Sequence, residues 1–157
     1  MEIAGTADVR TAPDAAVVYS ISYQPTKANK EAAEAYMAKH PEAMTIDCTL
    51  CGRRLADFGL VADVEDETDR EKIADIWRLA SRRFIESAAG NITAFVDNAD
   101  PRSVFRSEEL PDILKNPKIT TINGVDKYLF ASRFEEFRAA EAGRGGGAFA
   151  KAAACPA

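Results

Sequence analysis

The sequence has few of the residues that build metal centres, disulfide frameworks or histidine-dependent sites. Its 157 residues include one histidine, His40, and three cysteines, Cys48, Cys51 and Cys155. His40 stands at the end of a polar helical stretch, where it more simply faces the helix dipole than serves as a catalytic base. Three cysteines are too few for a disulfide framework, so we expect a chain without disulfides that acts in a reducing compartment. A structural zinc site, which needs about four ligands, is not expected either.

Long apolar runs and basic charge are also scarce. No apolar run reaches the length of about 18 residues that a membrane-spanning helix needs, and residues 1–14 lack the apolar core of a secretory signal peptide. The 20 lysines and arginines are outnumbered by 25 aspartates and glutamates, for a net charge of −5. This balance argues against binding to nucleic acid or to an anionic membrane surface. We therefore expect a soluble protein that acts in a reducing cytosol, with secretion into another cell left open.

Alternating apolar and helix-forming stretches predict an α/β fold. Strands are expected over 15–22, 43–47, 91–96, 118–122 and 125–130, and helices over 29–40, 68–89 and 133–141. A turn followed by a short helix is expected over 49–60, a single helical turn over 111–114, and a loop over 101–109. Strands that alternate with helices indicate a mostly parallel central sheet flanked by helices. We expect one folded domain over 15–141, between a flexible N-terminal segment, 1–14, and a low-complexity flexible tail, 142–157.

Two short patterns define the expected elements most sharply. Thr68 followed by Glu71 forms a capping box, which predicts a helix with its N-cap at Thr68. Apolar residues then recur at helical spacing until Gly90, which favours a stop there. Asn123-Gly124 is the two-residue pattern of a tight hairpin.

The segment Cys48-Thr49-Leu50-Cys51 can be interpreted in two ways. It follows an expected strand and precedes an expected helix, which is the setting of a redox-active C-x-x-C motif. Two small residues buried at a turn would look the same in the sequence, and this simpler interpretation is favoured.

Two other segments carry side chains suited to a ligand pocket. Trp77, Ser81 and Phe84 recur at i, i+4 and i+7, on one face of the expected helix. That face could be plain core, or a pocket wall where the indole stacks on a flat ring and the hydroxyl reaches a polar group. Residues 103–109 follow a strand, where α/β proteins bind ligands, and combine a hydroxyl, an aromatic ring and a carboxylate.

Together these segments resemble the ADP-ribosyl cyclase / NAD glycohydrolase family, known from animal ectoenzymes and bacterial toxin domains. The family carries W-x-x-x-S-R-R-F on a helix, which residues 77–84 match at each position. It then carries S-x-F-x-x-x-E before an apolar residue, which residues 103–110 match. The family's acidic residue two places before T-L-x-G is matched by Asp47, ahead of residues 49–52. The resemblance implies a small ADP-ribosyl cyclase-like domain, shorter than the animal enzymes and without their disulfides.

The resemblance also implies roles for single residues. It places the family's catalytic carboxylate on Glu109 and not on the neighbouring Glu108, and it places two serines on the diphosphate of the substrate. The implied catalytic residues are Glu109, Trp77 and Asp47. The implied substrate-binding residues are Tyr19, Ser20, Thr49, Ser81, Ser103 and Phe105.

The implied reaction is cleavage of the nicotinamide–ribose bond of NAD, to give nicotinamide plus ADP-ribose or a cyclic ADP-ribose isomer. NAD is then the substrate, and neither a metal nor another cofactor is expected. Because an enzyme that consumes NAD would poison its own cytosol, we expect a toxin or delivered effector with an inhibitor protein as partner. Two alternatives are a non-catalytic module that binds NAD or ADP-ribose, and a small redox protein that uses Cys48 and Cys51.

Overall fold

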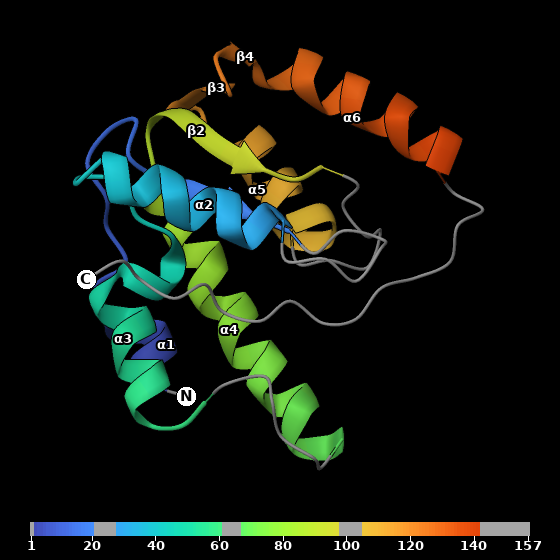
Figure 1. Ribbon diagram of the computed structural model, residues 1–157. Coiled ribbons are helices and arrows are strands. Elements are labelled where there is room, and N and C mark those ends of the chain that lie inside the picture. The colour runs from blue at the N-terminus through green and yellow to red at the C-terminus, as the bar shows by residue number, and fades with distance from the viewer. Residues whose placement is uncertain (1, 21–27, 61–66, 98–104, 142–157) are drawn as a thin grey trace.

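The computed structural model describes residues 2–20, 28–60, 67–97 and 105–141. In chain order, the elements are α1 (Glu2–Thr6), β1 (Val17–Tyr19), α2 (Ala28–Lys39), η1 (Ile46–Cys48), α3 (Leu50–Asp57), α4 (Glu67–Ser87), β2 (Gly90–Phe95), η2 (Phe105–Glu109), α5 (Leu110–Lys115), β3 (Ile119–Ile122), β4 (Val125–Asp126) and α6 (Lys127–Glu141) (Figure 1). Here η1 is a short 3-10 helix and η2 is a π-helical turn that runs directly into α5. Among the described helices, none has both the length and the apolar character needed to cross a bilayer.

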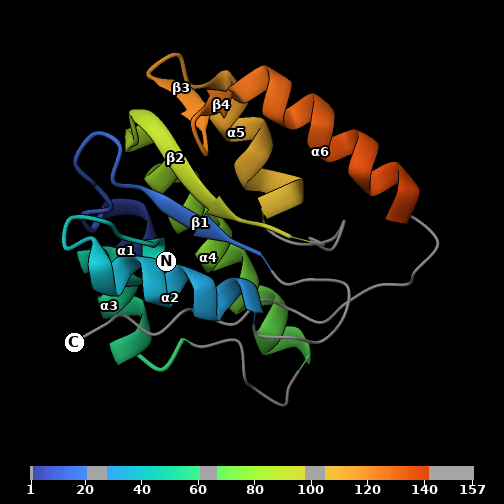
Figure 2. The same cartoon turned by 45° about the horizontal axis from the view of Figure 1, so that its top comes forward.

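The sheet has the strand order β1-β2-β3-β4, and its first three strands are parallel. Val17 of β1 lies opposite Thr93 of β2, and Figure 2 shows these two strands side by side. β4 pairs antiparallel with β3 after a tight turn at Asn123 and Gly124, where φ is 52° and 75°. The predictions of a mostly parallel sheet and of a hairpin at Asn123-Gly124 are therefore confirmed.

Helices cover both faces of the sheet because side chains alternate along its strands. Val18 of β1 and Ile92 of β2 pack into the larger core cluster, which includes the buried side chains of α4. Val17 and Phe95 point the other way, into a smaller cluster with Ala33 and other side chains of α2. The sheet is thus held between α2 and α4 (Figure 2), and the carboxyl ends of β1 and β2 meet at one edge.

α4 is the long helix that carries the Trp77 motif. Its buried face repeats every three to four residues and includes Ile73, Ala80, Phe84 and Ile85. The helix begins at Glu67, so Thr68 lies in its first turn and the prediction of an N-cap at Thr68 is wrong. The expected stop is present. The helix ends at Ser87, and Gly90 has a φ of 79°, with the Asp14 side chain where a Cβ would stand.

The N-terminal residues form part of the core, in contrast to the flexible segment expected over 1–14. α1 packs against α3 and α4, and Ala4, Ala7 and Val9 are buried. Small side chains allow this close approach of backbones. This packing could not be predicted from the sequence, because a five-residue helix is too short to display an apolar period.

Two further segments differ from expectation. The strand expected over 43–47 is a single parallel bridge between Ala16 and Met44, followed by η1. The loop expected over 101–109 is a π-helical turn from residue 105 onward. Residues 61–66 and 98–104 and the expected tail, 142–157, lie outside the described residues.

The strand expected over 125–130 is β4, which stops after two residues. The reason is Asp126, whose carboxylate accepts hydrogen bonds from the backbone N–H groups of Tyr128, at 3.0 Å, and Leu129, at 3.1 Å. This arrangement caps the N-terminus of α6 and turns the chain into a helix despite its strand-like composition. The last helix therefore begins at Lys127 and not at Arg133.

Candidate functional site

Glu109 is the last residue of η2, and its carboxyl group is buried. Its side chain and backbone together are 9% exposed. Burial raises the pKa of Glu109 from 4.5 to about 8, and the negative charges of Asp47 and Asp112 act in the same direction. Glu108, by contrast, lines a shallow outer pocket together with Arg78 and Arg82. A buried carboxyl with a strongly raised pKa is typical of a functional site, and this distinguishes Glu109 from its neighbour.

Asp47 is held in place by the junction between η1 and α3. Thr49 is the N-cap of α3: its hydroxyl accepts a hydrogen bond from the Gly52 N–H at 3.1 Å and donates to the Ile46 carbonyl at 2.6 Å. A Cβ on Gly52 would overlap the Ile46 carbonyl and the backbone of Asp47. The Thr-Leu-x-Gly pattern is therefore a compact turn that fixes Asp47, itself buried, at the start of α3.

Trp77 and Ser81 lie on α4, which contacts both η1 and η2. The indole Nε1–H of Trp77 donates to the Leu60 carbonyl at 2.7 Å, and the ring is half-buried against the larger core cluster. Because this hydrogen bond occupies the polar edge of the ring, Trp77 can offer a ligand only its apolar surface. Ser81, one turn later, is buried, and Phe84 is core. The helix face thus combines core residues with a tryptophan and a serine beside the two carboxylate-bearing segments.

The carboxyl ends of β1 and β2 are tied together by a residue that the sequence did not single out. The Asn29 side chain donates from Nδ2 to the Ser20 carbonyl at 2.8 Å and to the Asp97 carbonyl at 2.9 Å. Ser20 is buried at this edge, whereas Tyr19 packs against the smaller cluster on the α2 side. An asparagine in the first turn of an Ala- and Glu-rich helix looks like a helix-start residue, so its role as a clamp was not detectable from the sequence.

Phe105 lies deep in the core. It is 1% exposed, and its ring meets the Phe134 ring edge-on with 5.6 Å between centroids. Its observed role is to anchor the π-helical turn that ends at Glu109. Ser103 lies outside the described residues.

The two cysteines of the C-x-x-C segment are not joined to each other. Cys51 is a free, buried thiol, whereas Cys48 is disulfide-bonded, so the expectation of a chain without disulfides is wrong at Cys48. Burial raises the pKa of the Cys51 thiol, although the nearby Arg83 charge acts against this. A reactive redox thiol needs a lowered pKa, so the geometry favours the interpretation of a turn. In the part of the chain that the structure describes, no three potential ligands of a metal ion gather together.

Solved structures with a similar fold come from the ADP-ribosyl cyclases. Porcine CD38 with a covalent ribo-F-ribose-5′-phosphate intermediate is 17% identical, with a TM-score of 0.52 over 85% of this chain and 66% of that chain. An ADP-ribosyl cyclase complexed with N1-cIDPR is 17% identical, with a TM-score of 0.51 over 88% and 62%. Aplysia cyclase complexed with the substrate NGD and the product cGDPR is 18% identical, with a TM-score of 0.51 over 88% and 62%.

These likenesses concern the fold. The chain spans between 62% and 66% of the length of those structures, so it corresponds to a part of them. No protein-family model matches the chain, and no curated protein has significant sequence similarity to it. The protein therefore has a mixed α/β fold similar to that of the ADP-ribosyl cyclases.

Proposed function

We propose that the protein cleaves the nicotinamide–ribose bond of NAD, as an NAD glycohydrolase or ADP-ribosyl cyclase. The observation that carries the proposal is Glu109, a buried carboxyl at the end of η2, with a raised pKa and the Asp47 charge acting on it. It lies on a fold similar to that of enzymes solved with NAD analogues or reaction products. The W-x-x-x-S-R-R-F helix in contact with η2 adds support.

The chemistry suits a site whose central group is a carboxylate. The C1′–N bond breaks with its electron pair moving to the nicotinamide nitrogen, which neutralises the positive charge of the ring, so no general acid is needed. The ribose develops oxocarbenium character, and the Glu109 carboxylate stabilises this charge or bonds to C1′. Water then attacks C1′, and where Glu109 has bonded to C1′ its carboxylate leaves, to give ADP-ribose and a proton. Attack by an adenine nitrogen in place of water gives a cyclic isomer.

The other residues have proposed roles that follow from their chemistry. Trp77 presents its ring to nicotinamide, because its N–H is already bonded to Leu60. The hydroxyls of Ser81 and Ser103 donate to the diphosphate, and Asp47 accepts from the carboxamide or a ribose hydroxyl. Secondary substrate contacts are proposed for Tyr19 and Ser20. Thr49 and Phe105 are buried, and their proposed part is to hold η1 and η2 in place beside the substrate.

The raised pKa of Glu109 fits a cationic substrate. In the empty site, a pKa of about 8 leaves the carboxyl largely protonated at neutral pH. A nicotinamide ring with its positive charge favours the ionised form and lowers that pKa when it binds. Glu109 is then an ionised carboxylate when the positively charged nicotinamide ring is bound.

An enzyme that consumes NAD threatens the cell that makes it, so we propose that the protein is a toxin or delivered effector held in check by an inhibitor protein. Expression of the wild-type chain should then deplete cellular NAD, whereas the Glu109→Gln chain should leave it unchanged. Equal NAD levels in the two cultures would contradict this role.

The test is product analysis with purified protein. Incubation with NAD should release nicotinamide, and chromatography of the adenine-containing products should separate ADP-ribose from cyclic isomers. If no nicotinamide is released while NAD or ADP-ribose raises the melting temperature, the protein is a nucleotide-binding module and the proposed enzyme is excluded.

A further inference from the structure

We propose that Arg83 is a positioning residue: it fixes the N-terminal segment 2–10 across α3 and α4, and so keeps Asp47 in register with Glu109. This inference rests on the proposed function, because the register matters for the cleavage of NAD. The second arginine of the W-x-x-x-S-R-R-F segment thereby has a task distinct from those of Trp77 and Ser81.

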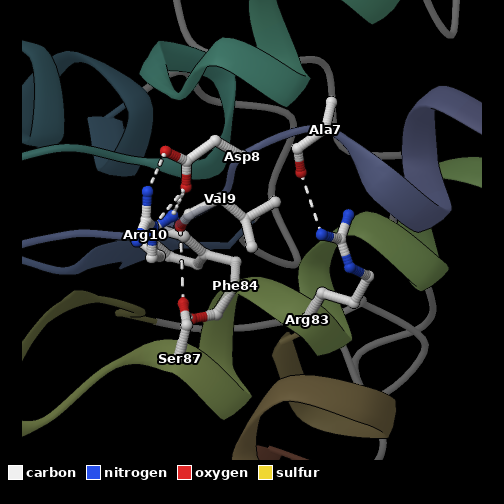
Figure 3. A network of polar contacts seen from close by, with 7 residues as sticks. All are labelled: Ala7, Asp8, Val9, Arg10, Arg83, Phe84 and Ser87. Atoms are coloured by element: carbon white, nitrogen blue, oxygen red, sulfur yellow. Dashed lines mark hydrogen bonds and ion pairs between the residues drawn. The ribbon is translucent and has the colours of Figure 1, made fainter.

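Arg83 binds the end of α1 through both terminal nitrogens of its guanidinium group. Nη1 donates to the Ala4 carbonyl at 2.7 Å, and Nη2 donates to the Ala7 carbonyl at 2.9 Å. Figure 3 shows the arginine reaching from α4 to Ala7. The last carbonyls of a helix have no partner within the helix and carry partial negative charge. The planar, permanently charged guanidinium group satisfies two such carbonyls at once, with two nitrogens held in a fixed fork geometry that lysine lacks.

The same N-terminal segment is joined to the first turn of α3. The backbone N–H of Cys51 donates to the Asp8 carbonyl at 2.9 Å, and the Cys51 thiol donates to the Ile3 carbonyl at 3.4 Å. A second contact with α4 is made by Ser87, whose hydroxyl lies 3.5 Å from the Val9 carbonyl. Segment 2–10 therefore offers backbone carbonyls to both α3 and α4, in addition to the buried side chains that it packs against them.

The turn between Ala7 and Arg10 is itself stiffened. The Asp8 carboxylate accepts from the Arg10 backbone N–H at 2.9 Å and from the Arg10 guanidinium group at 3.0 Å (Figure 3). The guanidinium and the backbone N–H of Arg10 together lower the pKa of Asp8 to about 2. The pair lies on the surface, with the Arg10 side chain 81% and the Asp8 side chain 42% exposed, so it adds little to the hold of Arg83 on the segment.

The bridge ends close to the candidate site on both sides. Cys51 follows the Thr49 cap and lies four residues after Asp47, in the turn where Gly52 touches the Asp47 backbone. Arg83 lies two residues after Ser81 on the helix that contacts η2. Removal of the guanidinium group would free α3 to shift against α4, and Asp47 would shift with it. Displacements of about 1 Å within a catalytic constellation can lower rates about 100-fold.

The experiment compares Arg83→Ala and Arg83→Lys with Arg82→Ala, a matched control on the exposed side of α4. Circular dichroism first identifies conditions in which all variants are folded. Two quantities are then measured under those conditions: kcat/KM for NAD, and the pKa of Glu109 by carbon-13 NMR titration. The second readout needs no enzymatic activity. The charged groups that act on Glu109 are Asp47 and Asp112, so a displaced Asp47 lowers its pKa.

We expect Arg83→Ala to lower kcat/KM about 10- to 100-fold and to lower the Glu109 pKa. Arg83→Lys keeps the charge but lacks the fixed pair of donor nitrogens, so it should recover part of both, and Arg82→Ala should match the wild type. If Arg83→Ala loses only thermal stability while both quantities stay at the wild-type value, the positioning role is overturned. If the wild type does not cleave NAD, the proposed function fails, and the NMR titration alone decides the positioning role. If Arg83→Ala does not fold, the Arg83→Lys titration decides it.

Discussion

At the scale of single residues, the Glu109 carboxyl is buried and has the charges of Asp47 and Asp112 acting on it. Such surroundings make its ionised form costly in the folded protein, whereas the unfolded chain ionises freely. The folded state therefore keeps a proton on Glu109 over a pH range in which the unfolded state has lost it. Stability consequently depends on pH through this one group.

The sign of that dependence gives a first prediction. The contribution of Glu109 to stability is highest below pH 4.5, falls as the pH rises, and levels off above about 8, the folded-state pKa. The cumulative loss is on the order of 4–5 kcal/mol. Glu109→Gln cannot ionise, so we expect it to be more stable than the wild type at pH 9 and similar at pH 4.5. Urea unfolding at the two pH values measures this.

Glu108→Gln is the control for that experiment, since Glu108 faces the outer pocket. It should keep the wild-type pH dependence of unfolding. If the free energy of unfolding changes equally with pH in the wild type and in Glu109→Gln, the Glu109 carboxyl does not have a raised pKa in the folded protein.

Trp77 gives a second prediction at this scale, because its two functions can be separated. Trp77→Phe keeps an aromatic face but loses the N–H that binds the Leu60 carbonyl, so we expect a loss of about 1 kcal/mol in stability with activity largely retained. Trp77→Ala also loses the ring face, and we expect kcat/KM about tenfold below that of Trp77→Phe. Rates corrected for the folded fraction make the comparison. If both variants keep the same corrected rate, Trp77 serves only the core.

At the scale of elements, the site depends on three short junctions: η1 with α3, η2 with α5, and the ends of β1 and β2. The Thr49 side chain fixes the junction of η1 with α3, and the Asn29 side chain fixes the ends of β1 and β2, each by hydrogen bonds to backbone groups. The buried ring of Phe105 fixes the junction of η2 with α5. Regular helix and strand geometry sets the positions of the residues within each element. Asp47 and Glu109 lie at junctions between elements, so these local contacts decide their positions.

Gly52 gives the prediction for these junctions. A methyl group there would overlap the Ile46 carbonyl and the Asp47 backbone, so Gly52→Ala should cost about 1–3 kcal/mol and lower activity by moving Asp47. Gly5→Ala is the matched control, as no atom lies within 4 Å of its added methyl group. That variant should be neutral or stabilised by up to about 1 kcal/mol. Thermal unfolding of both compares them, and equal melting temperatures would contradict the close approach at Gly52.

Much of the fold at this scale could be predicted from the sequence. Helical periodicity located α4, and the Asn-Gly pair located the turn between β3 and β4. The predictions were wrong for segments where a single side chain or a long-range contact overrides the local preference for helix, strand or loop. Asp126 converts a strand-like segment into the start of α6, and Arg83 on α4 captures α1 from a distant part of the sequence.

At the scale of the whole molecule, the chain spans between 62% and 66% of the ADP-ribosyl cyclase structures that it resembles in fold. It nevertheless contains the three-layer core and the segments that carry Asp47, Trp77 and Glu109. The family resemblance singled out Glu109 and not Glu108, and the structure buries Glu109 while Glu108 lines the outer pocket. The bridge from Arg83 to Cys51 could not be predicted, since it consists of contacts to backbone carbonyls, which no residue pattern encodes.

The central claim is that Glu109, and not a neighbouring acid, cleaves the nicotinamide–ribose bond of NAD. It is tested most directly by nicotinamide release from NAD with wild type, Glu109→Gln and Glu108→Gln side by side at equal folded concentration. We predict release by the wild type and by Glu108→Gln at comparable rates, and a loss of about 100-fold or more in Glu109→Gln. Folded Glu109→Gln that releases nicotinamide at the wild-type rate, or wild type that releases none, would contradict the claim.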